Sequence, residues 1–119
     1  PTRAARALRN AHALGAPDLQ MVEGRAPQAL DGLPTPDAIF VGGGATAPGA
    51  MDKAMAALRS GGRLVVNAVT LETQALLTSL HSERGGDLVS IQIGHAVPVG
   101  RFSGLRQDMP VLQWRWSKP

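Results

Sequence analysis

The sequence contains no cysteine, no tyrosine and no long hydrophobic run, and these absences exclude several classes of protein. Without cysteine there is no disulfide bond, no thiolate nucleophile and no cysteine-based zinc site. No apolar run approaches the roughly 18 residues of a membrane span, so we expect no membrane partner. The first residues are polar and basic, which does not match a secretory signal. We therefore expect a cytoplasmic protein.

Aromatic residues are scarce, at 3% of the chain, and the net charge of +3 comes from ten arginines and two lysines that are scattered along it. A nucleic-acid surface would need a clustered basic stripe, and stacking rings if it bound single strands. We therefore expect no nucleic-acid partner. The excess of arginine over lysine favours contacts with carboxylates or phosphates of fixed geometry.

The overall composition is typical of a folded globular chain, with 44% hydrophobic and 18% charged residues. A length of 119 residues corresponds to at most one domain. The chain begins at Pro1 and passes at once into a helical pattern, so we expect it to be a segment of something longer.

Helical and strand-like patterns alternate over the first two thirds of the chain. Such alternation with short connections predicts parallel strands joined by right-handed crossovers. The predicted elements are a helix over 3–14 ended by Gly15, a strand over 19–22, a short helix or turn-rich crossover over 25–33, a strand over 38–41, a helix from Thr46 or Pro48 to Arg59, a buried strand over 63–69 covered on both faces, and a helix over 71–84 capped by Thr70.

The last third breaks this alternation. Residues 88–100 and 109–117 are both strand-like, alternate at period two, and are separated by a polar stretch over 100–108 that we expect to be a loop. In the final segment Trp114 and Trp116 share one face, and Gln113 and Arg115 share the other. The pattern predicts an antiparallel hairpin added to a parallel sheet.

A parallel α/β sheet with a terminal antiparallel hairpin is the architecture of the class I S-adenosylmethionine-dependent methyltransferases. Three runs narrow the resemblance: "EGRAPQAL" (23–30), "LPTPDAIFVGGG" (33–44) and "ALRSGGRLVVNAVTLET" (57–73). Together they resemble the C15-methylating domain of the decarboxylating precorrin methyltransferases of cobalamin biosynthesis, over essentially residues 1–117.

This resemblance implies a Rossmann-like class I methyltransferase sheet, mostly parallel with a C-terminal antiparallel hairpin, in which residues 1–119 form the C-terminal part of a single domain. It implies S-adenosylmethionine as cofactor and a precorrin tetrapyrrole as substrate, with loss of an acetate carboxylate. It also implies a homo-oligomer, in some relatives fused to a C5-methylating domain. The first two strands of the fold, with its glycine-rich cofactor loop and ribose-binding acid, have no counterpart in this sequence. In the fold they lie between the strands expected over 19–22 and 38–41, whose edges should therefore be exposed.

Three consecutive glycines follow the strand over 38–41, and three interpretations of them are open. Gly42, Gly44 and Ala47 fit a dinucleotide-binding template, but the next strand has no acid at its end to hold a ribose, and Glu72 lies in the following helix. The glycines could instead serve only as a turn. The resemblance favours a third role, with Gly42 and Gly43 beside the cofactor and Gly44 beside the substrate, where absent side chains admit a bulky planar ligand.

A second motif, in "EGRAP", includes Gly24, Arg25 and Ala26. The resemblance places these three residues against the adenine of the cofactor, although many relatives have an acidic residue in place of Arg25. The alternative is a plain turn between a strand and a helix.

Polar residues at the end of the buried strand are candidate substrate contacts, since open α/β sheets bind ligands at the carboxyl ends of their strands. They are Asn67, Thr70 and Glu72. The alternative for Asn67 is a hydrogen bond to neighbouring backbone, and for Thr70 and Glu72 a place at the start of a helix.

The resemblance adds His95 and Arg101, because a tetrapyrrole rimmed with carboxylates suits arginine clamps. The histidines are too dispersed for a metal site, so no metal is expected. No catalytic base can be identified. Two rival functions stay open: a nicotinamide-dependent oxidoreductase fragment that uses the 42–47 loop, and a non-catalytic α/β module.

Overall fold

The computed structural model describes residues 2–25 and 27–119. They form two compact units, residues 1–33 and residues 34–119. The candidate cofactor- and substrate-binding residues other than the 24–26 motif belong to the second unit.

The first unit consists of α1 (Thr2–Ala13) and the 3-10 helix η1 (Gln28–Leu30), which begins after Pro27. Gly15 has a φ of 92° and ends α1, as predicted. The predicted strand over 19–22 is wrong, because the structure assigns these residues to no strand. A strand needs a hydrogen-bonded neighbour, and within this unit the described residues provide none. Leu19 and Val22 are accordingly about half exposed, at 49% and 52%.

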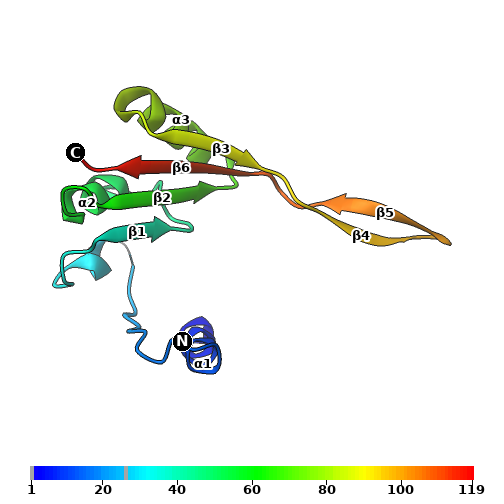
Figure 1. The fold of residues 1–119 in the computed structure, drawn as a ribbon, viewed down its shortest axis with the longest axis horizontal. Coiled ribbons are helices and arrows are strands. Elements are labelled where there is room, and N and C mark those ends of the chain that lie inside the picture. Colours follow the sequence, from blue (N-terminus) through cyan, green and yellow to red (C-terminus); the bar gives the residue numbers. More distant parts are fainter. Residues whose placement is uncertain (1, 26) are drawn as a thin grey trace. The chain divides into compact units, whose positions relative to one another are not determined.

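The second unit contains two helices and six strands among its described residues (Figure 1). They are β1 (Ala38–Val41), α2 (Ala50–Ala57), β2 (Arg63–Ala68), α3 (Leu71–Arg84), β3 (Asp87–Ile91), β4 (Gly94–Val99), β5 (Phe102–Gln107) and β6 (Val111–Ser117).

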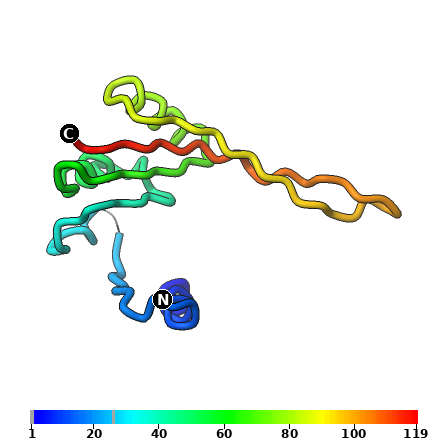
Figure 2. Tube along the Cα trace, viewed as in Figure 1, coloured from blue at the N-terminus to red at the C-terminus, as the bar shows by residue number. Residues whose placement is uncertain are grey.

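Four strands form the main sheet, in the order β1-β2-β6-β3. β1 and β2 are parallel, and β6 is antiparallel to both β2 and β3, so β3 runs in the direction of β1 and β2. Figure 2 shows the red C-terminal strand lying between the green β2 and the yellow β3. The α/β class, the parallel crossovers and the inserted antiparallel strand are thereby confirmed.

Helix α2 is shorter than predicted. It begins at Ala50 rather than near Thr46 or Pro48, because Gly49 adopts a left-handed conformation with a φ of 77° and interrupts the helical path. It ends at Ala57, because Leu58 turns to an extended conformation and directs the chain toward β2. Helix α3, by contrast, has the predicted bounds and the predicted Thr70 cap.

The predicted loop over 100–108 is wrong. Residues 102–107 form β5, which pairs with β4 through a tight turn at Gly100 and Arg101, and the predicted strand over 88–100 is interrupted at Gln92 and Ile93. This β4–β5 hairpin continues away from the main sheet (Figure 1). Polar side chains do not prevent strand pairing here, because both faces of the ribbon are largely exposed.

The hydrophobic core covers one face of the main sheet. Alternate residues of β2, together with Trp114 and Trp116 of β6, pack against the apolar faces of α2 and α3; the buried cluster includes Met51, Met55, Leu58, Leu64, Val66, Ala68, Leu77 and Leu80. β2 is not covered equally on both faces, contrary to the prediction. Val65 and Asn67 are only half-buried, since within this unit both helices pack on the opposite face.

Candidate functional site

The candidate site lies where the parallel strands β1 and β2 end. Val41 pairs with Val66, so the next residues along the two strands, Gly42 and Asn67, follow side by side. Parallel strands place their carboxyl ends on one edge of the sheet, and that edge is where ligands bind in open α/β folds. The sheet thus brings the predicted glycines and the predicted polar strand end together.

The three glycines form a ledge without side chains. A Cβ added at Gly43 or Gly44 would meet nothing within 4 Å, and one at Gly42 would meet only the ring of Phe40, at 3.2 Å. Gly44 has a φ of 76°, a conformation that other residues rarely adopt. Only Gly44 of the three therefore needs glycine for its backbone angles, and the space above Gly43 is open.

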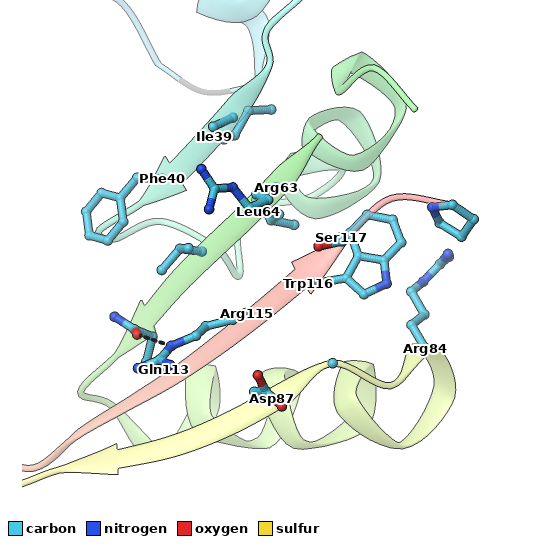
Figure 3. Close-up of a pocket in the computed structure, with 14 residues that line it drawn as sticks. Ile39, Phe40, Arg63, Leu64, Arg84, Asp87, Gln113, Arg115, Trp116 and Ser117 are labelled. Carbon is cyan, nitrogen blue, oxygen red and sulfur yellow. Dashed lines mark hydrogen bonds between the residues drawn. The ribbon is translucent and has the colours of Figure 1, made fainter. Parts of the chain in front are cut away.

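Asn67 lies in a chain of hydrogen bonds on the face of the sheet opposite the core. Its Oδ1 accepts a hydrogen bond from Gln113 Nε2 at 2.8 Å, and Gln113 Oε1 accepts one from Arg115 Nε at 2.8 Å. Figure 3 shows the second bond as a dashed line along β6. The alternative expected for Asn67, a bond to neighbouring backbone, is replaced by this side-chain contact across two strands.

Thr70 and Glu72 occupy the start of α3. Thr70 Oγ1 accepts a hydrogen bond from the Thr73 amide at 3.2 Å and donates one to Thr73 Oγ1 at 2.9 Å, so its hydroxyl caps the helix. Glu72 is exposed in the first turn, where its charge interacts favourably with the helix dipole. Both residues therefore have the helix-start roles that were the alternatives to substrate binding: Thr70 caps α3, and Glu72 lies in its first turn.

His95 and Arg101 lie on the β4–β5 hairpin rather than on the main sheet. His95 Nε2 is 3.0 Å from Asp108 Oδ2, and both side chains are more than half exposed. Arg101 is exposed in the tight turn between the two strands. The structure brings neither residue into contact with the glycine ledge, and its hydrogen bonds give His95 a partner that the sequence had not indicated.

Gly24 and Arg25 lie in the first unit, and Ala26 lies outside the described residues. Arg25 is exposed. A Cβ at Gly24 would lie 3.0 Å from the Cβ of Ala29, so a side chain there would need Ala29 to shift by a few tenths of an ångström. This local packing favours glycine at position 24.

A hollow of about 960 Å³ in the second unit does not include the glycine ledge. It is lined by residues of β1, β2, β3 and β6, including Phe40, Arg63, Asp87 and Arg115 (Figure 3). Phe40 is 62% exposed in it. This hollow lies on the uncovered face of the sheet, whereas the candidate site lies at the ends of β1 and β2.

Sequence reasoning did not identify Gln113 and Arg115 as part of the site. Their place opposite the tryptophans was predicted, but the contact of Gln113 with Asn67 depends on a strand register that joins residues 46 positions apart. The one available signal was the polar alternation in "QWRWS".

Two features are absent from the part of the chain that the structure describes. No group of three or more histidine, aspartate or glutamate residues is arranged to hold a metal ion. No helix there combines the length and the apolar composition needed to cross a bilayer.

The family model of the precorrin methyltransferase domain matches residues 1–118. A relative from Sinorhizobium sp, the decarboxylating precorrin-6Y C(5,15)-methyltransferase, is 53% identical over 118 residues; the match covers 99% of this chain and 29% of that protein.

Solved structures agree with this match. A precorrin-6Y C5,15-methyltransferase targeted domain from Corynebacterium diphtheriae is 43% identical with a TM-score of 0.90, covering 99% of this chain and 70% of that one. The C-terminal domain of the enzyme from Rhodobacter capsulatus is 41% identical with a TM-score of 0.89, covering 98% and 64%. The chain spans less than a third of the length of the Sinorhizobium relative. It belongs to the precorrin methyltransferase domain family.

Proposed function

We propose that this chain is part of an S-adenosylmethionine-dependent methyltransferase that methylates C15 of a precorrin and removes an acetate carboxylate in cobalamin biosynthesis. The observation that carries the proposal is the open ledge at Gly42–Gly44, beside Asn67 at the ends of two parallel strands. The names of the similar proteins from Sinorhizobium and Rhodobacter capsulatus support the same activity.

The cofactor would lie against residues that have no bulky side chains. Gly42 and Gly43 offer open backbone, and the space above Gly43 contains no atom that an added Cβ would meet. Gly24, Arg25 and Ala26 would contact the adenine. When bound, S-adenosylmethionine supplies an electrophilic methyl group on a sulfonium.

The substrate would approach over Gly44 and Asn67. Methyl transfer requires alignment of the two reacting atoms and exclusion of water more than it requires an acid or a base. That requirement fits a ledge of glycines flanked by one half-buried amide. Thr70 would contribute through the position of α3, because its hydroxyl already caps that helix.

Charged residues would hold the carboxylates at the rim of the tetrapyrrole. Arg101 and His95 on the β4–β5 hairpin, both exposed, are the proposed contacts, and Glu72 would lie near the uncharged part of the ring. An arginine binds a carboxylate through two parallel hydrogen bonds and so fixes its direction as well as its position.

The longer protein is proposed to be a cytoplasmic homo-oligomer, with a C5-methylating domain preceding this one. The name of the Sinorhizobium relative includes both ring positions, and this chain covers only 29% of that protein. Assembly is supported by Val99 and Phe102, paired on the hairpin and 58% and 76% exposed. A two-stranded hairpin is at best marginally stable alone, so burial against a second copy would stabilise it.

Calorimetry on the full-length protein tests the cofactor. S-adenosylhomocysteine should bind, and NAD should not. Mass spectrometry of a precorrin incubated with the protein and S-adenosylmethionine should then detect the gain of a methyl group and the loss of carbon dioxide. Binding of NAD without binding of S-adenosylhomocysteine would refute the proposal and favour the oxidoreductase interpretation of the 42–47 loop.

A further inference from the structure

We infer that Arg115 and Gln113 orient the amide of Asn67 so that it presents N–H donors, and not an oxygen, to the ligand. Gln113 and Arg115 are positioning residues, and the ligand group at Asn67 is an oxygen acceptor, a carboxylate or a carbonyl. The identity of that ligand rests on the proposed function, whereas the orientation of the amide does not.

The orientation follows from the chemistry of arginine. A guanidinium has only donors, so the atom of Gln113 that faces Arg115 Nε must be its oxygen. The nitrogen of Gln113 is then the atom that faces Asn67, at 2.8 Å from Asn67 Oδ1. Arg115 therefore fixes the orientation of the Gln113 amide, and the Gln113 amide in turn fixes which atom of the Asn67 amide faces it.

Asn67 has one oxygen and one nitrogen, and its oxygen is occupied by Gln113. Among the residues that the structure describes, no hydrogen bond from Asn67 Nδ2 is recorded. Asn67 is half-buried, and its Nδ2 has two N–H donors available beside the strand end that carries the glycine ledge. A ligand that covered these donors without offering an acceptor would leave them unpaired, which is unfavourable, so this position selects a ligand with an acceptor oxygen.

The inference predicts that the Asn67 amide reverses its orientation when residue 113 can no longer donate a hydrogen bond. In Gln113→Glu the carboxylate accepts from Arg115 and can donate nothing to Asn67. In this variant Asn67 turns its nitrogen toward the new carboxylate and its oxygen toward the ligand. Asn67→Asp also removes the N–H donors that face the ligand, while its carboxylate still accepts the hydrogen bond from Gln113.

The test measures KM for the precorrin and kcat with the full-length protein. Gln113→Glu and Asn67→Asp should each raise KM by about tenfold or more, the value of a lost hydrogen bond to a charged group, with a smaller change in kcat. In an Asn67→Ala background, Gln113→Glu should raise KM no further. Arg63→Leu, which removes another arginine from the same sheet face, should leave KM unchanged.

Arg115 variants test the chain without altering either amide. In Arg115→Leu the amide of Gln113 is free to take both directions, and a halved competent population should raise KM about twofold. Arg115→Lys retains a donor and should restore the normal value. If Gln113→Glu fails to fold, the comparison of Arg115→Leu with Arg115→Lys still tests whether Arg115 orients the two amides.

A separate readout needs no substrate. In ¹⁵N-labelled protein, the side-chain amide protons of Gln113 should exchange slowly with water in the wild type and in Arg115→Lys, and faster in Arg115→Leu. A wild type that methylates precorrin while Gln113→Glu keeps a normal KM would overturn the inference and leave the proposed function intact. A wild type without methyl transfer would refute the proposed function, and equal exchange in all three proteins would then refute the inference as well.

Discussion

Trp114 Nε1 donates a hydrogen bond to the carbonyl oxygen of Gly85, 2.9 Å away. Trp114 is fully buried in β6, and Gly85 is the residue at which α3 ends. The bond therefore joins the antiparallel strand inserted in the sheet to the helix that precedes β3. It holds β6 in place beside α3, and Gln113, the residue before Trp114 in β6, bonds to Asn67.

Trp114→Phe should destabilise the protein by about 2 kcal/mol, because it leaves the Gly85 carbonyl without its partner and removes part of a buried ring. Trp116→Phe is the matched control. It removes the same atoms from the neighbouring ring, which stacks on Trp114 with centroids 5.8 Å apart, and no hydrogen bond to its indole nitrogen is recorded among the described residues. Urea denaturation of the full-length protein measures both, and equal losses would contradict the role of the bond.

Gly86→Ala should destabilise more than Gly85→Ala, although both glycines have a positive φ, of 83° and 75°. Gly85 has a ψ of −147°, in a region that other residues rarely adopt, so backbone strain alone should cost Gly85→Ala about 1–3 kcal/mol, and the positive φ of Gly86 strains its variant too. At Gly86 the added Cβ would also overlap the carbonyl oxygen of Arg115, whereas at Gly85 it would meet nothing within 4 Å. Thermal melting of the two variants gives the difference directly. The same melting temperature for both would show that β3 and β6 can separate there without loss.

Lys118 caps the end of α2 from a distance of about 60 positions in the sequence. Its Nζ lies 2.9 Å from the carbonyl oxygen of Met55 and 2.7 Å from that of Leu58. Lys118→Met should reduce stability by about 1–2 kcal/mol, since these carbonyls lose a charged donor at the negative end of the helix dipole. Lys118→Arg retains the charge and should recover part of the loss. Denaturation midpoints that do not distinguish the methionine variant from the wild type would exclude a capping role.

Local chemistry could be predicted from the sequence, and long-range pairing could not. Thr70 was identified as a cap because its hydroxyl and the helix pattern that follows it lie within one segment. The start of α2 was misplaced because it depends on the left-handed conformation of Gly49, which many glycines in loops do not adopt. The strand expected over 19–22 has the right pattern but no partner within its unit.

The candidate site shows the same limit. Gly42 and Asn67 were placed together because parallel strands with short connections must end at one edge. Gln113 was not connected to Asn67, because that contact needs the register of β6 against β2, and a shift of one residue would turn Gln113 to the core face. β5 was missed because its polar residues resemble a loop until β4 is known to lie beside it.

Gly43→Val should preserve the fold and weaken ligand binding. An added Cβ at Gly43 meets nothing within 4 Å, and its backbone does not have a positive φ, so stability should change by no more than about 0.5 kcal/mol. The new side chain would, however, occupy the ledge on which the cofactor is proposed to lie. Displacement of a ligand by bulk of this size should raise the Kd of S-adenosylhomocysteine by about tenfold or more, the equivalent of 1.4 kcal/mol.

Ala57→Val is the matched control for Gly43→Val, because it adds apolar bulk at the exposed end of α2, away from the strand ends. It should leave the Kd unchanged. Calorimetric titration of both variants in the full-length protein, with melting curves to establish that each is folded, separates occlusion of the ledge from unfolding. A folded Gly43→Val protein with an unaltered Kd would place the cofactor elsewhere. The glycines after β1 would then serve only to turn the chain.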